Sequence, residues 1–137
     1  MRDSQLSGLG ALTVVFIAVA LPTATAIEII AIRGDPIAGS TPAGTLQNVF
    51  EGPVINQVGE VTTTNYLEGT GYDFSNNYVV LSTAGGQISA VAQEGQPAPG
   101  TGAGVVFDRY NQGNAPPVIN NYGQTAYQAE LRGLGDT

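Results

Sequence analysis

Residues 117–133, PVINNYGQTAYQAELRG, decide the fold class of this chain. Asn120-Asn121-Tyr122-Gly123 favours a tight turn, because asparagine side chains bond to nearby backbone and glycine adopts positive φ. After the turn, two sets of residues alternate: Thr125, Tyr127, Ala129 and Leu131 against Gln124, Ala126, Gln128 and Glu130. Alternation with period two is typical of a β-strand with one apolar and one polar face. The stretch therefore predicts an antiparallel β-hairpin.

Earlier parts of the chain resemble later ones. Residues 53–59 (PVINQVG) recur 64 positions later as PVINNYG, and residues 33–40 (RGDPIAGS) recur 61 positions later as EGQPAPGT. Two matches in the same order, with a small insertion between them, predict an internal repeat. The first copy would cover about 31–92, and a second, partial copy about 93–137.

Each copy is predicted to hold four antiparallel strands, two of them around the Asn-x-x-Gly turn. The other two, residues 78–82 (YVVLS) and 88–92 (ISAVA), flank a glycine-rich turn and contain β-branched and aromatic residues. Four antiparallel strands per unit are typical of a β-propeller blade, which needs neighbouring blades to bury its faces. The sequence therefore predicts an all-β, incomplete propeller-like protein, a fragment of a longer chain.

The first copy alternates less cleanly after its turn. Its inward set would be Val61, Thr63, Asn65 and Leu67, of which two are polar. Terminal repeats are commonly atypical, so we expect the first copy to lie at an edge or an end of the array of repeats. The stronger alternation around Tyr127 predicts that this ring packs in the sheet.

Residues 1–26 have the three parts of a secretory signal peptide. Arg2 supplies a positive start, residues 10–21 (GALTVVFIAVAL) an uncharged apolar run, and Ala24-Thr25-Ala26 a cleavage site of small residues. The apolar run is shorter than the ~20 residues that span a bilayer. The pattern predicts a signal helix cleaved after Ala26, and export of residues 27–137 to the cell surface or medium without membrane insertion. A buried core helix and an uncleaved anchor are the alternatives.

Composition excludes several classes of chemistry. The 137 residues carry a formal charge of −7, and their four cationic side chains are all arginines. Nucleic-acid binding needs a basic surface, so that class of partner is not expected. The chain has no cysteine and no histidine, which rules out disulfides, thiolate nucleophiles and imidazole acid–base catalysis by its own residues. We therefore predict no catalytic residues and no bound cofactor.

A few residues remain as candidates for function. Asn56, Gly59, Asn120 and Gly123 are predicted to be structural turn residues. Carboxylate and amide oxygens favour Ca²⁺, so the loop holding Asp73, Asn76 and Asn77 is the candidate metal site. Exposed tyrosines suit contacts with sugars or proteins, and Tyr110 and Tyr122, expected in loops, are the candidate contact residues. Carboxylate pairs for glycoside hydrolysis would be Glu94 with Asp108, or Glu51 with Glu60.

The chain also resembles a known family. Residues 120–127 (NNYGQTAY) are similar to the Asn-x-x-Gly-x-x-Ala-Phe signature of a bacterial family of exported tandem-repeat proteins, which also shows blocks like residues 95–101 (GQPAPGT) and 117–120 (PVIN). The first copy departs from this signature, with Thr62 and Thr63 where Ala and Phe belong. The resemblance implies export and repeat architecture, and the family has no established activity.

Three hypotheses about function follow. The first is a non-enzymatic secreted or cell-surface repeat module for adhesion or ligand display, whose partners are an extracellular ligand or further repeats of a parent chain. The second is part of a propeller enzyme that acts on glycans through carboxylates. The third is a calcium-stabilised structural array.

Overall fold

The computed structural model describes residues 14–17, 28–47, 51–110 and 115–133. Every regular element in them is a β-strand, so the all-β prediction is confirmed. The strands are β1 (Val14–Ile17), β2 (Glu28–Ile32), β3 (Pro36–Ile37), β4 (Gly44–Leu46), β5 (Glu51–Ile55), β6 (Val61–Glu68), β7 (Tyr78–Ser82), β8 (Ser89–Gln93), β9 (Val106–Tyr110), β10 (Val118–Ile119), β11 (Thr125–Ala126) and β12 (Ala129–Arg132). No helix in these described parts is long and apolar enough to cross a membrane.

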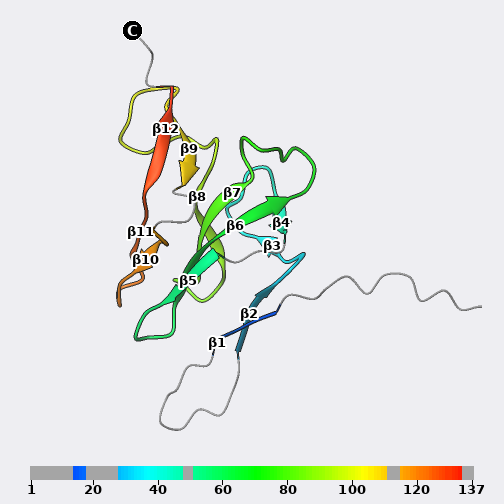
Figure 1. The fold of residues 1–137 in the computed structure, drawn as a ribbon, viewed down its shortest axis with the longest axis vertical. Coiled ribbons are helices and arrows are strands. Elements are labelled where there is room, and N and C mark those ends of the chain that lie inside the picture. Colours follow the sequence, from blue (N-terminus) through cyan, green and yellow to red (C-terminus); the bar gives the residue numbers. More distant parts are fainter. Residues whose placement is uncertain (1–13, 18–27, 48–50, 111–114, 134–137) are drawn as a thin grey trace, which may run out of the picture.

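The largest sheet is a curled antiparallel sheet centred on β6 and β7 (Figure 1). β5, β6, β7 and β8 pair in chain order, which agrees with the two predicted hairpins. The far end of β6 pairs with β4, and β4 pairs with β3. Three two-stranded ladders complete the described structure: β1 with β2, β10 with β11, and β9 with β12.

β6 is an interior strand of the largest sheet. It has β4 and β5 along one edge and β7 along the other. Thr62, Thr63, Thr64 and Asn65 are all buried although they are polar. Their side chains face covered sheet surfaces on both sides, so alternation between apolar and polar residues gives no guide to the position of this strand.

Segments 61 residues apart make the same backbone hydrogen bonds. The Gly34 N–H donates to the Leu46 carbonyl at 2.9 Å, and the Gly95 N–H donates to the Phe107 carbonyl at 2.8 Å. The hydroxyls that end these segments also match: Ser40 donates to the Ile37 carbonyl, and Thr101 to the Ala98 carbonyl. Both segments therefore form the same turn, although they share few identical residues.

The ladders that follow these turns correspond as well. In β4 and β6, Thr45 lies opposite Glu68 and Leu46 opposite Leu67. In β9 and β12, Val106 lies opposite Arg132 and Phe107 opposite Leu131. The offset is 61 on the first strand of each pair and 64 on the second, as in the sequence.

Two apolar clusters cover the faces of the central sheet. One contains Ala31, Ile37, Leu46, Leu67, Val79 and Leu81. The other contains Tyr78, Val80, Ala92, Ala98, Val105 and Phe107, with Tyr66, Tyr127 and Ala129 packed against it. Because alternate residues of β7 enter opposite clusters, this strand is buried throughout. Tyr127 packs here as predicted, and burial raises the pKa of its hydroxyl.

Most of the predicted leader lies outside the described residues. The described part, Val14–Ile17, is strand β1, paired antiparallel with β2. Tyr110, expected in a loop, lies at the end of β9 opposite Ala129, and its side chain is outside the described structure. β9 extends past its apolar residues through Asp108 and Arg109, so Tyr110 belongs to a strand and not to a loop.

Candidate functional site

The two Asn-x-x-Gly turns have the same internal construction. In each turn the asparagine Oδ1 accepts two backbone N–H groups: those of Val58 and Glu60 for Asn56, and those of Tyr122 and Gln124 for Asn120. Each asparagine Nδ2 also donates to the side chain four residues on, Glu60 or Gln124. Gly59 and Gly123 have φ of +88° and +76°. The four predicted turn residues thus have the local geometry that their types suggest.

The turns also contact each other across 64 residues. Asn56 Nδ2 donates to the Asn120 carbonyl at 2.8 Å. The Gln57 N–H donates to Asn121 Oδ1, and Asn121 Nδ2 donates to Gln57 Oε1, both at 3.0 Å. A Cβ on Gly123 would lie 3.3 Å from Oε2 of Glu60 in the first turn. The turns therefore form one surface with close packing, which we call the paired turns (residues 56–60 and 120–124).

Each turn exposes an apolar side chain at its third position. Val58 is 64% exposed and Tyr122 is 89% exposed. Corresponding positions therefore place two accessible apolar groups on one surface, as a contact site requires. Of the two predicted contact residues, Tyr122 belongs to this surface.

Replacing the two turn asparagines should have unequal effects. We expect Asn56→Ala to lower the free energy of unfolding by about 2 kcal/mol and Asn120→Ala by about 1 kcal/mol, because Asn56 also bonds to the second turn. Urea denaturation of both variants measures this. If the two variants lose the same unfolding free energy, the hydrogen bond from Asn56 to the second turn does not stabilise the fold.

The candidate calcium loop uses its polar atoms internally. Asp73 Oδ1 accepts the hydroxyl and the backbone N–H of Ser75, at 2.6 and 2.7 Å. Asn76 Oδ1 accepts the Asp73 N–H, and Asn76 Nδ2 donates to the Gly71 carbonyl. The Asn77 carbonyl accepts the Leu67 N–H. Among the described residues no group of three or more acidic side chains is arranged to hold a metal ion.

The hydrogen bonds from Ser75 lower the pKa of the Asp73 carboxyl, the hydroxyl contributing most. A carboxyl with a lowered pKa favours the folded state above its unfolded pKa, and this contribution is lost as pH falls through the folded pKa. We expect Ser75→Ala to raise the pKa of Asp73 in an NMR titration of its carboxyl carbon. Ser89→Ala, at the end of the β7–β8 ladder that is farther from this loop, should leave that titration unchanged.

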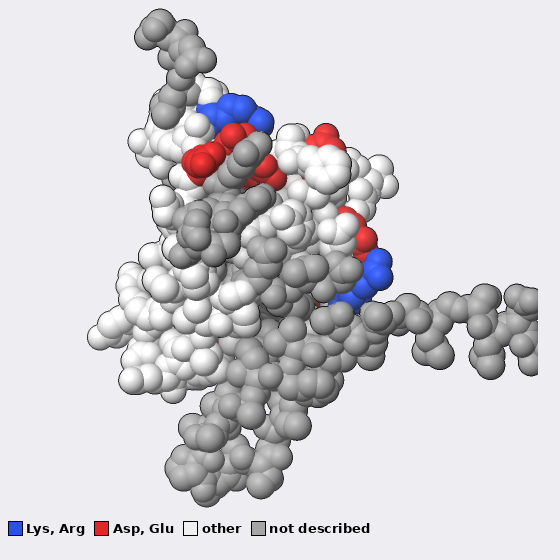
Figure 2. Space-filling view, viewed as in Figure 1, with Lys and Arg blue, Asp and Glu red and all other residues white. Residues whose placement is uncertain are grey.

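An acidic cleft of about 420 Å³ lies beside this loop, lined by Asp73, Phe74, Ser75, Glu94, Asp108 and Arg132. Asp108 pairs with Arg132 at 3.0 Å, and buried Glu94 accepts the Tyr78 N–H. Figure 2 shows acidic and arginine atoms together near the end of the molecule where β9 and β12 lie. The structure thus brings together Glu94 and Asp108, one of the two carboxylate pairs suggested by the sequence.

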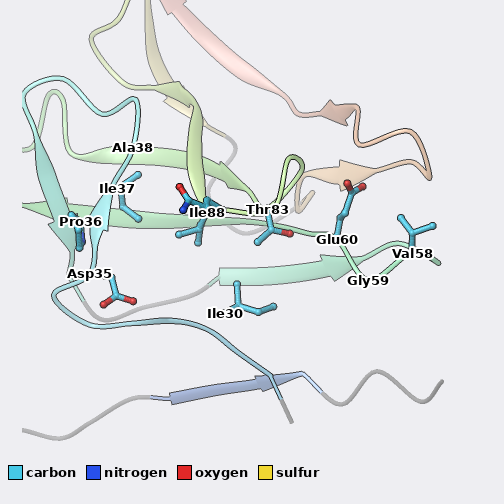
Figure 3. A pocket seen from close by; sticks show the side chains of 12 residues that line it. Ile30, Asp35, Pro36, Ile37, Ala38, Val58, Gly59, Glu60, Thr83 and Ile88 are labelled. Carbon is cyan, nitrogen blue, oxygen red and sulfur yellow. The ribbon is translucent and has the colours of Figure 1, made fainter. Parts of the chain in front are cut away.

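A second cleft of about 790 Å³ lies between the β2–β3 region and the first Asn-x-x-Gly turn. Figure 3 shows Asp35 and Glu60 at opposite ends of it, with Ile37, Ile88 and Thr83 between. Asp35 Oδ2 accepts the Ile32 N–H, and Glu60 Oε2 accepts Asn56 Nδ2. Both carboxylates therefore stabilise turns. For Glu51, the partner suggested for Glu60, only the backbone is described.

A comparison with protein families finds a match over nearly the whole chain. A family model matches residues 7–137. The chain belongs to DUF7453, a family of unknown function. No curated protein and no solved structure matches this DUF7453 chain.

Proposed function

We propose that this DUF7453 chain is a non-enzymatic, exported β-repeat module that presents the paired turns as a contact surface for adhesion or ligand display. The observation that carries the proposal is that both turns hold an exposed apolar residue at the same position. Val58 and Tyr122 are 64% and 89% exposed on turns that are hydrogen-bonded to each other. Tyrosine combines an apolar ring with a polar hydroxyl, which suits contact with sugars or proteins.

The repeat interpretation takes residues from about 31 to 92 as the first copy and residues from about 93 to 137 as a second, partial copy. It is supported by the matching hydrogen bonds 61 residues apart and by the equivalent ladders β4–β6 and β9–β12. We further propose that such units stack in a propeller-like array. Apolar clusters on both faces of the central sheet support it.

Export is supported by the sequence of residues 1–26, with Arg2, the uncharged apolar run and the small residues at 24–26. An extracellular ligand or further repeat units are the proposed partners. The resemblance to exported tandem-repeat proteins points the same way.

The test is binding of the full chain to immobilised cellulose, chitin and dextran, with Tyr122→Ser as the variant. Phe74→Ser is the matched control, because Phe74 is 95% exposed and lies in the loop beside the acidic cleft. We expect Tyr122→Ser to reduce binding about fivefold or more, since stacked aromatic contacts dominate such surfaces. Equal losses in both variants, or no binding to any of the three polymers, would count against the proposal.

The acidic cleft favours a second candidate, hydrolysis of glycosides by two carboxylates. Glu94 and Asp108 line this cleft together. If this candidate is right, Glu94→Gln and Asp108→Asn each abolish release of nitrophenol from aryl glycosides, while Tyr122→Ser does not. The ion pair with Arg132 counts against this candidate, because it engages the carboxylate of Asp108 that would have to act in catalysis.

A further inference from the structure

One cleft of the molecule has the size of a site for a small ligand. It lies between the β2–β3 region and the first Asn-x-x-Gly turn, and its volume of about 790 Å³ falls within the range of small-molecule pockets, about 300–1,000 Å³. Parts of three segments form most of its walls: residues 35–38, 58–60 and 83–88. All three follow residue 26, so cleavage of the predicted signal peptide leaves these walls in the chain. We call this site the isoleucine cleft.

Backbone hydrogen bonds fix the walls of the isoleucine cleft to the central sheet. The Ala90 N–H donates to the Ala38 carbonyl at 2.8 Å, which ties the first wall to β8. The Thr83 N–H donates to the Val61 carbonyl at 2.9 Å, and the Val61 N–H donates to Thr83 Oγ1 at 2.8 Å. These two bonds join the third wall to β6, the strand that follows the second wall. The cleft is therefore formed before a ligand arrives, which lowers the entropic cost of binding.

Two carboxylates mark the ends of the isoleucine cleft. Figure 3 shows Asp35 at one end and Glu60 at the other. Asp35 Oδ2 accepts the Ile32 N–H at 2.9 Å, and Glu60 Oε2 accepts Asn56 Nδ2 at 2.8 Å. Asp35 Oδ1 and Glu60 Oε1 accept no hydrogen bond from the described residues, and neither carboxylate forms an ion pair with a described arginine. Each end therefore offers a carboxylate oxygen and a negative charge to a cation.

The middle of the isoleucine cleft is apolar. Ile37 and Ile88 lie between the two carboxylates, and Pro36 beside them has no N–H (Figure 3). Thr83 also lies there, and its hydroxyl oxygen already accepts the Val61 N–H. Isoleucine and proline side chains offer no hydrogen-bond partner to a peptide backbone, whose unpaired polar groups would cost free energy. A chain of methylene groups has no such cost and suits this part of the cleft.

We propose that the isoleucine cleft binds a linear aliphatic polyamine, with one ammonium group at Asp35, another at Glu60, and the methylene chain over Ile37 and Ile88. Charge-assisted hydrogen bonds to the two carboxylates hold the ends of the ligand. Burial of its methylene groups against the isoleucines adds hydrophobic free energy. The formal charge of −7 also draws a polycation to the chain. This activity goes beyond the contact surface of the paired turns, whose polymer binding depends on Tyr122.

Calorimetric titration of the full chain with aliphatic diamines, from tetramethylenediamine to dodecamethylenediamine, tests the proposal at low ionic strength, where charges are little screened. Each diamine is compared with the monoamine of the same chain length, which has one ammonium group. Asp35→Asn and Glu60→Gln remove one charge each and keep an oxygen for the hydrogen bond within the turn. Glu130→Gln is the matched control, because Glu130 is exposed on β12, outside the cleft, and the change in net charge is the same.

We expect the best-fitting diamine to bind about fivefold more tightly than its monoamine, since an accessible ion pair contributes up to about that factor. Asp35→Asn and Glu60→Gln should each weaken binding by a similar factor, and Glu130→Gln by less than about twofold. Equal affinities of diamine and monoamine would overturn the proposal, as would equal effects of Glu60→Gln and Glu130→Gln, or no binding of any diamine at about millimolar concentration. Tyr122→Ser should bind diamines as the unmodified chain does, so this test and the polymer-binding test fail independently.

Discussion

Leu67→Ala is expected to lower the free energy of unfolding by about 3 kcal/mol, because truncating a buried leucine removes apolar contacts and leaves a cavity. Leu67 is 1% exposed and packs in the cluster with Leu46 and Leu81. Urea denaturation of the full chain at low micromolar concentration measures the loss.

Leu131→Ala is the control for this prediction, because Leu131 occupies the equivalent position in β12 but is 36% exposed. We expect it to cost less than about 1 kcal/mol, since a partly exposed side chain loses little on truncation. A loss as large as that of Leu67→Ala would show that β12 is as well covered as β6.

Gly44→Ala is expected to destabilise the fold by about 2 kcal/mol, because the added methyl group overpacks a filled site. A Cβ at Gly44 would lie 2.6 Å from Cε2 of Tyr72, and the Tyr72 hydroxyl is held by the Pro42 carbonyl. Gly44 is not among the glycines with positive φ, so the effect comes from space and not from backbone conformation. Thermal denaturation followed by circular dichroism measures the change.

Gly102→Ala is the matched control, because Gly102 also lacks a positive φ and has no atom within 4 Å of a new Cβ. This substitution should be neutral or stabilise by up to about 1 kcal/mol, through reduced freedom of the unfolded chain. In a Tyr72→Ala background, Gly44→Ala should cost less than half as much, since the two residues share one contact. An unchanged cost in that background would contradict the overpacking mechanism.

The sequence by itself determined the local structure of this DUF7453 chain. Turn residues such as Asn56 and Gly59, and the β-branched run at 78–82, predicted both hairpins of the central sheet, because asparagine, glycine and β-branched residues act through short-range backbone and steric effects. Composition also limited the chemistry, since a chain without cysteine or histidine lacks thiolate and imidazole groups.

Only the tertiary structure decided what each strand contacts. Thr62 and Asn65 interrupt the apolar–polar alternation of their strand, yet β6 is interior and both are fully buried, whereas the cleanly alternating β12 is the more exposed strand. The contact between Gln57 and Asn121, and the approach of Glu94 to Asp108, likewise join residues far apart in the chain. Such neighbours depend on how whole strands pair and how sheet faces pack, and these are long-range interactions that a local sequence pattern does not encode.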